Sequence, residues 1–227
     1  MSFKDMGVVM KYKIREDGRI EALKDFGSIT KGTIGGFISE EENLSHEGNC
    51  WVYGNARVSG KARVFGDARV FENAKVDGNA EVYGKASVYG NAKVDGNAWV
   101  FENAWVSGNA EVFGDAHVFG NAKVDGNARV YGNAEVFGNA KVDGNAEVYG
   151  KASVSGSSIV NGIRPYYFIQ ASQHTITATL EAITIGCKTH TSKHWLENYK
   201  QISKANGYTK EQIAEYGAIL SLFKKWK

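Results

Sequence analysis

The residues best suited to metal chemistry are Cys187, His190 and His194, which follow one another as C-x2-H-x3-H. Thiolates and imidazoles are common zinc ligands, but a closed zinc site needs four of them. The surrounding sequence offers no second ligand cluster, and His174 would complete the set only by an accident of folding. A nucleophilic Cys187 activated by His190 is a weaker hypothesis still, because no third residue orients the base. We therefore expect no metal, no cofactor and no catalytic residue here.

A second kind of chemistry is phosphate binding, for which Arg57, Arg63 and Arg69 are the candidates. Guanidinium groups bind phosphate oxygens through paired, charge-assisted hydrogen bonds. Outward-facing arginines at this regular spacing would suit a nucleotide-type ligand. Their arrangement depends on the element that carries them.

That element is a six-residue repeat that runs from Trp51 to Gly156 with the pattern V-x-G-N-A-x. Valine occupies every sixth position from Val52 to Val154, and alanine every sixth position from Ala56 to Ala152. A fixed short period indicates a repeat architecture, and a period of six is typical of a β-solenoid. The sequence therefore predicts one uninterrupted solenoid.

Each hexad consists of a strand, A-x-V-x, and a corner, G-N. Because strand side chains alternate, alanine and valine point inward. The corner needs a positive φ, which glycine adopts freely and asparagine tolerates. Two corners, Glu72-Asn73 and Glu102-Asn103, lack glycine but keep asparagine. We predict a mainly β fold, a single-stranded triangular β-helix with three hexads per coil. The residue pattern favours the left-handed coil of hexapeptide acyltransferases over the right-handed coil of bactofilin-type proteins.

Residues eighteen apart would stack on one face of this coil. Trp99 and Trp105 point outward in adjacent strands, and Trp195 and Tyr199 are further interface candidates on a predicted helix. Two interpretations of the stacked aromatic residues stay open: they stabilise neighbouring coils, or they mark an interface with a partner. One column is aromatic over five coils and consists of Phe65, Tyr83, Phe101, Phe119 and Phe137.

The solenoid itself is a poor candidate for an enzyme. Hexapeptide acyltransferases typically use a histidine at a groove between subunits and an inserted loop that shapes the substrate pocket. Here the repeat has no insertion, and its single histidine, His117, points outward. A γ-class carbonic anhydrase needs three histidines from adjoining subunits, which this repeat does not supply.

The flanking segments are expected to differ from the repeat. Residues 1–50 are predicted to form a cap with short strands over Val8–Ile14 and around Ile20, joined by a tight turn at Asp17-Gly18. The solenoid is predicted over residues 51–162.

Residues 163–227 are predicted to form a separate module that begins at Pro165. Segments Tyr166–Gln170 and Thr175–Ile185 alternate like a β-hairpin. Two helices follow, the first from about Ser192 to Ala205 and the second beginning after Thr209, where T-K-E-Q has capping-box spacing. These helices are expected to pack as an αα-hairpin.

Two segments carry a resemblance to a known group. The run Ala22–Val58, which leads into the repeat, and the run Thr184–Tyr216 resemble phage- and prophage-encoded hexapeptide-repeat proteins, described as polymer-forming cytoskeletal-like or acyltransferase-like. The resemblance implies a phage origin and the host cytoplasm as the location. It implies no defined activity.

Net charge, cysteine content and hydropathy exclude several classes of partner. The net charge is +2, so neither the basic stripe of a nucleic-acid binder nor the acidity of a DNA mimic is present. The two cysteines, Cys50 and Cys187, are typical of reduced cytosolic thiols. No apolar run approaches the ~20 residues of a membrane span. We expect a cytoplasmic protein without a membrane partner.

The favoured hypothesis is a non-catalytic solenoid that acts as a binding or scaffold protein, for example a phage accessory or counter-defence factor. Its partner would be a host protein or a nucleotide-type ligand, and the chain is expected to form a homo-oligomer. The alternatives are an acyltransferase-like enzyme with a pocket between subunits and a bactofilin-like protein that assembles into filaments.

Overall fold

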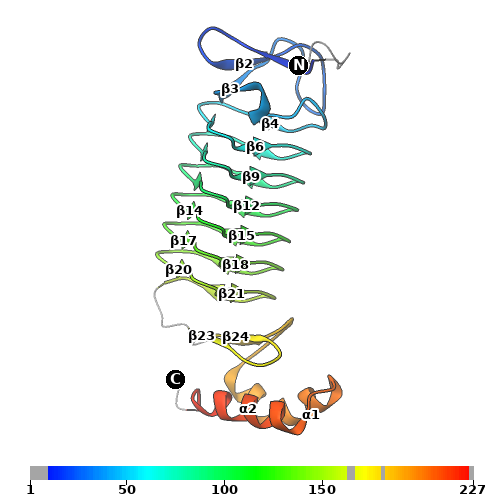
Figure 1. The fold of residues 1–227 in the computed structure, drawn as a ribbon, viewed down its shortest axis with the longest axis vertical. Coiled ribbons are helices and arrows are strands. Elements are labelled where there is room, and N and C mark those ends of the chain that lie inside the picture. The colour runs from blue at the N-terminus through cyan, green and yellow to red at the C-terminus, as the bar shows by residue number, and fades with distance from the viewer. Residues whose placement is uncertain (1–9, 163–166, 180–181, 225–227) are drawn as a thin grey trace.

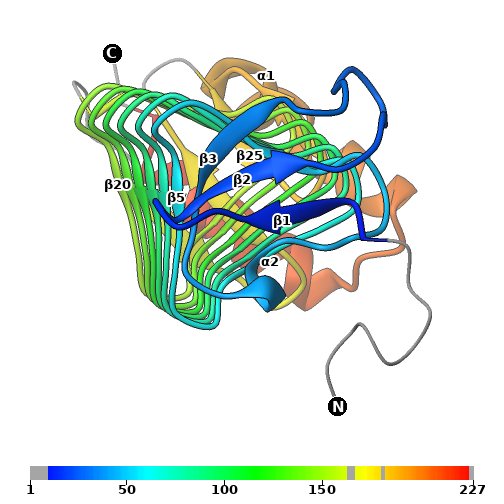
Figure 2. The same ribbon diagram turned by 90° about the horizontal axis from the view of Figure 1, so that it is seen from above.

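The computed structural model describes residues 10–162, 167–179 and 182–224, which form an elongated rod (Figure 1). A cap lies at one end, a stack of coils forms the middle, and a small sheet with two helices lies at the other end. Figure 2 looks along the rod and shows the coils stacked in register, with the cap strands lying across them. The predicted mainly β solenoid with two C-terminal helices is confirmed.

The cap begins with an antiparallel hairpin. Strands β1 (Tyr12–Ile14) and β2 (Arg19–Ala22) pair in register, and β3 (Ile34–Ile38) pairs antiparallel with β2. The predicted turn at Asp17-Gly18 joins β1 to β2, and Gly18 has a φ of +78°. The first part of the strand predicted from Val8 lies outside the described residues.

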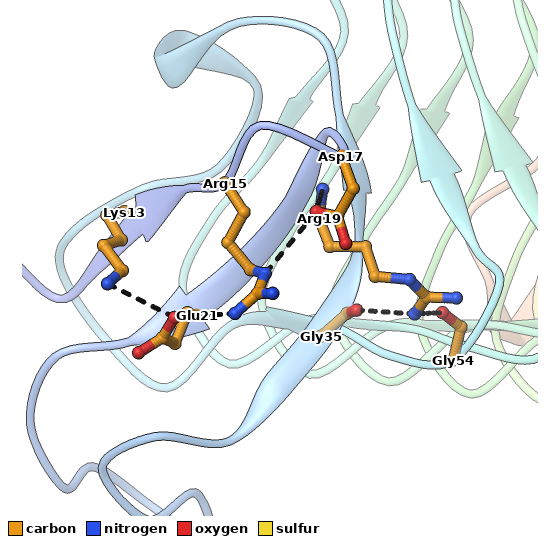
Figure 3. A network of polar contacts seen from close by, with 7 residues as sticks. All are labelled: Lys13, Arg15, Asp17, Arg19, Glu21, Gly35 and Gly54. Carbon is orange, nitrogen blue, oxygen red and sulfur yellow. Dashed lines mark hydrogen bonds and ion pairs between the residues drawn. The ribbon is translucent and has the colours of Figure 1, made fainter.

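Polar contacts tie this hairpin to the first coil (Figure 3). Within the hairpin, Lys13 of β1 and Arg15, just after β1, pair with Glu21 of β2 at 3.3 and 3.0 Å. Ion pairs of this exposed kind contribute little to stability, because water and salt screen them. Arg19 also donates a hydrogen bond of 2.9 Å to the carbonyl oxygen of Gly54, which lies at a corner of the first coil.

The coils are built from two-residue strands, each ending on an inward valine, that form three parallel sheets. The first sheet continues from β3 through β5 (Arg57–Val58), β8 (Lys75–Val76), β11 (Lys93–Val94), β14 (Glu111–Val112), β17 (Arg129–Val130) and β20 (Glu147–Val148). The second contains β4 (Trp51–Val52), β7 (Arg69–Val70), β10 (Ser87–Val88), β13 (Trp105–Val106), β16 (Lys123–Val124), β19 (Lys141–Val142) and β22 (Ile159–Val160). The third contains β6 (Arg63–Val64), β9 (Glu81–Val82), β12 (Trp99–Val100), β15 (His117–Val118), β18 (Glu135–Val136) and β21 (Ser153–Val154).

The interior of the rod is a column of small apolar side chains. Strands pair with those eighteen residues away, so that Val58 lies opposite Val76. The repeat valines from Val52 to Val154 and the repeat alanines from Ala56 to Ala146 are at most 1% exposed. Burial of one valine side chain contributes roughly 1.5–3 kcal/mol. The packed interior is therefore the main source of stability.

The corners add a second set of contacts on the outside of the rod. Along one edge, each asparagine donates its side-chain amide to the side-chain oxygen of the asparagine one coil further on, at 3.0–3.2 Å. This row of hydrogen bonds runs from Asn73 to Asn145 and consists of Asn73, Asn91, Asn109, Asn127 and Asn145.

The first residue of each corner adopts a positive φ. In the repeat this residue is glycine, with φ between +59° and +73°, except at two corners. Glu72 and Glu102 adopt the same conformation, with φ of +61° and +59°. A side chain there costs roughly 1–2 kcal/mol because Cβ crowds the carbonyl oxygen.

Parallel stacking begins earlier than the predicted boundary at residue 51. Strand β3 pairs in parallel with β5, and Leu44 forms a bridge with Val64. A Cβ on Gly35 would lie 2.5 Å from the carbonyl oxygen of Val52, so only glycine allows β3 to pack this closely on the first coil. The hexad pattern did not reveal this first layer because its residues do not follow the repeat.

One buried side chain completes the edge of the first coil. Asn43, at the end of the short helix η2 (Glu41–Asn43), is 1% exposed. Its amide donates to the carbonyl oxygens of Gly60 and Ala62 at 3.0 and 2.8 Å. Its side-chain oxygen accepts from the backbone amides of Ser39 and Glu40. Asn43 thus replaces the strand that an earlier coil would have supplied.

The C-terminal module contains a four-stranded antiparallel sheet rather than a two-stranded hairpin. Its strands are β23 (Tyr167–Gln170), β24 (Thr175–Ala178), β25 (Ile183–Ile185) and β26 (Lys188–His190). The helices α1 (Ser192–Ala205) and α2 (Lys210–Ser221) follow, with the predicted capping box at Thr209. No helix among the described residues is long and apolar enough to cross a membrane.

Side-chain hydroxyls join this module to the last coil. Thr177 of β24 donates to the carbonyl oxygen of Ser153 at 2.6 Å, and Ser155 donates to that of Gly186 at 3.1 Å. Ser158 and Thr184 also share a hydrogen bond. The C-terminal sheet therefore covers the last coil, as the cap covers the first.

Replacing Asn43 by alanine would leave buried backbone groups of the first coil unpaired. We expect Asn43→Ala to lower the free energy of unfolding by about 2–4 kcal/mol, measured by urea denaturation. Asn133→Ala, at an exposed corner, is the matched control and should change stability by less than about 0.5 kcal/mol. Equal effects of the two substitutions would contradict the capping role.

Candidate functional site

The predicted aromatic column is continuous. Its rings lie at the ends of β6, β9, β12, β15 and β18, with successive centroids 4.7–4.9 Å apart and ring planes within 3–6° of parallel. We call this set the aromatic ladder: Phe65, Tyr83, Phe101, Phe119 and Phe137.

Ring orientation decides what the aromatic ladder can bind. Because neighbouring rings stack face to face, the faces of the inner rings are covered by the rings above and below. All five side chains are half-buried. The inner rings present mainly edges to solvent, so most of the ladder packs one coil against the next. Only its two ends can leave a ring face free.

Two tryptophans stand out beyond this packed surface. Trp99 on β12 is 40% exposed and Trp105 on β13 is 44% exposed. The ring of Trp99 stacks on His117 at 4.9 Å, and the Lys123 ammonium lies 4.7 Å from the centroid of Trp105. Trp105 also meets the ring of Tyr89 edge-on at a centroid distance of 6.5 Å, and both tryptophans keep a large part of their surface exposed.

The corner between these tryptophans begins with Glu102, one of the two strained non-glycine corners. Strained backbone conformations persist only where the surrounding structure enforces them, and they cluster at functional sites. We call the set Trp99, Glu102 and Trp105 the tryptophan corner. It is a convex edge between two sheets, with an exposed carboxylate flanked by two large aromatic side chains.

The three candidate arginines do not form one site. Arg57, Arg63 and Arg69 lie on β5, β6 and β7, which belong to three different sheets. The guanidinium of Arg57 packs over the ring of Phe37 at 4.1 Å, and Arg63 pairs with Glu81 at 3.5 Å. A six-residue spacing places consecutive arginines on successive faces of a triangular coil. Convergence on one phosphate is therefore excluded.

The interface candidates on the first helix also need correction. Trp195 is 2% exposed, and its indole nitrogen donates to the carbonyl oxygen of Ile183 at 2.6 Å. Tyr199 is partly buried against the same core. Trp195 thus holds α1 onto the C-terminal sheet and is not available at the surface. An apolar helix face looks the same in sequence whether it meets its own sheet or a partner.

The C-x2-H-x3-H segment brings two of its three side chains together. The rings of His190 and His194 stack with centroids 4.1 Å apart. Burial lowers the pKa of His190, and the neighbouring His194 acts in the same direction. Among the residues that the structure describes, no group of three or more His, Cys, Asp or Glu side chains could hold a metal ion.

The cap contains a buried pair of side chains that no sequence pattern indicated. Lys11 is 1% exposed, and its ammonium nitrogen lies 3.0 Å from the carbonyl oxygen of Cys50 and 3.3 Å from the Cys50 sulfur. Burial lowers the pKa of Lys11 and raises the pKa of the Cys50 thiol, while each group partly opposes the shift of the other. The contacts with backbone carbonyls indicate a structural role.

The fold and two comparisons with known proteins define this chain as a β-solenoid protein built from hexapeptide repeats. A family model described as "YdcK Beta solenoid repeat" matches residues 52–64. The Escherichia coli (strain K12) protein named "Uncharacterized acetyltransferase YdcK" is 40% identical over 50 residues. That match covers 18% of this chain and 15% of the relative, so the similarity is confined to a short part of each.

The stacking role of the aromatic ladder can be tested at its centre. Phe101→Ala removes two ring-on-ring contacts and should lower the free energy of unfolding by about 1–3 kcal/mol, measured by urea denaturation. Trp99→Ala, two residues earlier in the chain, removes a single stacking contact and should lower the free energy of unfolding by less. If Trp99→Ala destabilised the protein more than Phe101→Ala, the ladder would not be the stabilising element.

Proposed function

We propose that this protein is a non-catalytic scaffold that binds a partner protein at the tryptophan corner. The observation that carries the proposal is the retention of a strained Glu102 between two exposed tryptophans, where all but one of the other repeat corners begin with glycine. Stability alone favours glycine at a positive φ. The glutamate is therefore best explained by what it contacts outside the chain.

The shape of the corner favours a protein as the partner. A convex edge does not enclose a small molecule, whereas ligand pockets are concave and bury most of the ligand. Exposed tryptophan is among the residues most enriched at energetically dominant interface positions. Glu102 would suit a cationic side chain on the partner, and the stacked coils would hold all three groups without further ordering.

The resemblance to phage-encoded repeat proteins suggests a host protein as the partner, with the chain acting as an accessory or counter-defence factor in the host cytoplasm. A nucleotide ligand is a less favoured version, because the three arginines lie on separate faces. Filament growth by stacking of solenoid ends is also disfavoured, because both ends are covered by other structure.

The proposal predicts that Trp99→Ala with Trp105→Ala abolishes partner capture while the protein stays folded. Capture would be measured by affinity purification from host cells followed by mass spectrometry. Phe113 and Tyr131 stack with centroids 4.9 Å apart on another sheet, beside β14 and β17. The control double variant Phe113→Ala with Tyr131→Ala should retain the partner. Capture of the same proteins by both double variants would contradict the proposal.

The two glutamate corners provide a sharper pair of variants. Glu102→Gly and Glu72→Gly each relieve backbone strain, and each should raise the free energy of unfolding by roughly 0.5–1 kcal/mol after the entropy cost of glycine. Only Glu102→Gly should weaken partner capture, because Glu72 has no exposed tryptophan beside it. Unfolding curves and capture would be measured on the same samples. If both variants captured the partner equally well, Glu102 would have no role in partner binding, which would contradict the proposal.

An acyltransferase is the second candidate, favoured by the name of the Escherichia coli relative. In that case acetyl-CoA should bind with measurable heat in isothermal titration calorimetry, and His117→Ala should reduce turnover. The scaffold proposal expects no heat of binding for acetyl-CoA. Saturable binding of acetyl-CoA would favour the acyltransferase hypothesis over the scaffold hypothesis.

A further inference from the structure

The aromatic ladder stops at Phe65 because the next position is occupied by a small residue. Leu44 bridges Val64 in parallel, so the residue in register with Phe65 is Ser45. The backbone amide of Ser45 bonds to the carbonyl oxygen of Val64, which continues the stacking of the coils. Tyr83 covers one face of Phe65 at a centroid distance of 4.7 Å. A serine cannot cover the other face as a ring would, and the Arg63 guanidinium lies over the Phe65 ring only at 5.4 Å from its centroid.

A cavity of about 540 Å³ lies at this position. Its lining includes Phe65, Val64 and Leu44 together with Ser45 and His46. This volume falls in the range of about 300–1,000 Å³ typical of ligand sites, which are mostly apolar with a few polar groups. We call this cavity the ring vacancy, because the register places it where the next ring of the aromatic ladder would lie.

The charged side chains around the ring vacancy indicate which kind of group would bind there. Its lining carries four carboxylates, two basic side chains and His46. Arg63 pairs with Glu81 at 3.5 Å, and His46 lies 3.2 Å from the Glu41 carboxylate. Phosphate groups would be repelled, which argues against a nucleotide. An aromatic ring flanked by cations fits both the apolar floor and the acidic rim. The four carboxylates belong to Glu40, Glu41, Glu42 and Glu47.

The chain itself carries such a segment. Trp226 is preceded by Lys224 and Lys225 and followed by Lys227, and residues 157–227 contain nine basic and four acidic side chains. Residues 1–50, which supply most of the acidic rim, contain seven basic and nine acidic side chains. The two ends of the chain therefore have complementary charge.

The length of the rod prevents Trp226 from reaching the ring vacancy of its own chain. The third sheet spans five strand intervals from β6 to β21, which is about 24 Å, and the C-terminal module lies beyond β21 (Figure 1). Trp226 is two residues past Lys224, and two residues span at most about 7 Å. Only a second copy can bring Trp226 to this cavity.

We infer that the ring vacancy is a docking site for the Lys224–Lys227 segment of a second copy, with Trp226 stacked on Phe65 as an additional ring. The contact joins different surfaces of the two copies, so it is heterologous and produces a head-to-tail chain unless the rotation closes it. This inference is independent of the tryptophan corner, because it uses other residues at the end of the rod.

Filling the ring vacancy from within the chain gives the most direct test. Ser45→Phe would place a ring in register with Phe65 and exclude Trp226. Sedimentation equilibrium should show wild-type protein with an average mass that rises above 24.8 kDa with concentration. Ser45→Phe and Trp226→Ala should each weaken association roughly tenfold or more. Ser59→Phe, at the same hexad position on another face, should associate like the wild type.

Two further experiments test the docking site if Ser45→Phe does not fold. Glu42→Gln with Glu47→Gln, both exposed, should weaken association and reduce its dependence on salt, because two of the four rim carboxylates are neutralised. A labelled peptide of residues 221–227 should bind the Trp226→Ala protein, and its Trp226→Ala version should not. Trp99→Ala with Trp105→Ala should associate like the wild type, which separates this site from the proposed function. A wild type that stays at 24.8 kDa at all concentrations, or folded Ser45→Phe that associates normally, overturns the inference.

Discussion

The close packing of one alanine and one valine per hexad inside a narrow coil is the constraint on which the rest of the structure depends. The interior has room for side chains of this size, and the coils stack at the strand spacing only if every corner turns in the same way. The positive φ of each corner supplies that turn. Outward residues are consequently held in straight columns, and each column becomes a ladder of like side chains.

A stack of this kind has two exposed ends, and the protein covers them differently. At the N-terminal end the amide of Asn43 and the strand β3 satisfy the edge of the first coil. At the C-terminal end hydroxyl groups of the antiparallel sheet bond to the last coil. These contacts cover the ends of the stack, where solenoids could otherwise add to one another through their backbone edges.

The rigid columns also explain why irregularities are informative. In a repeat so uniform, a residue that departs from the pattern costs stability unless something offsets the cost. Glu102 departs by adopting a glycine conformation between two exposed tryptophans. Ser45, in the irregular layer before the repeat, leaves the aromatic ladder one ring short beside an acidic cavity. The tryptophan corner and the ring vacancy each lie at such an irregular position.

The sequence alone determined the solenoid, because a period of six allows only one repeated turn and strand, and it placed the five rings of the aromatic ladder correctly by spacing. It also predicted the Asp17-Gly18 turn and both helices from local capping chemistry. Burial and register were decided only by the tertiary structure. Trp195 faces its own sheet, Arg57, Arg63 and Arg69 diverge, and Leu44 rather than a repeat residue sets the register at the ring vacancy. Local spacing fixes the direction of a side chain within one coil, whereas its neighbours depend on segments far away in the chain.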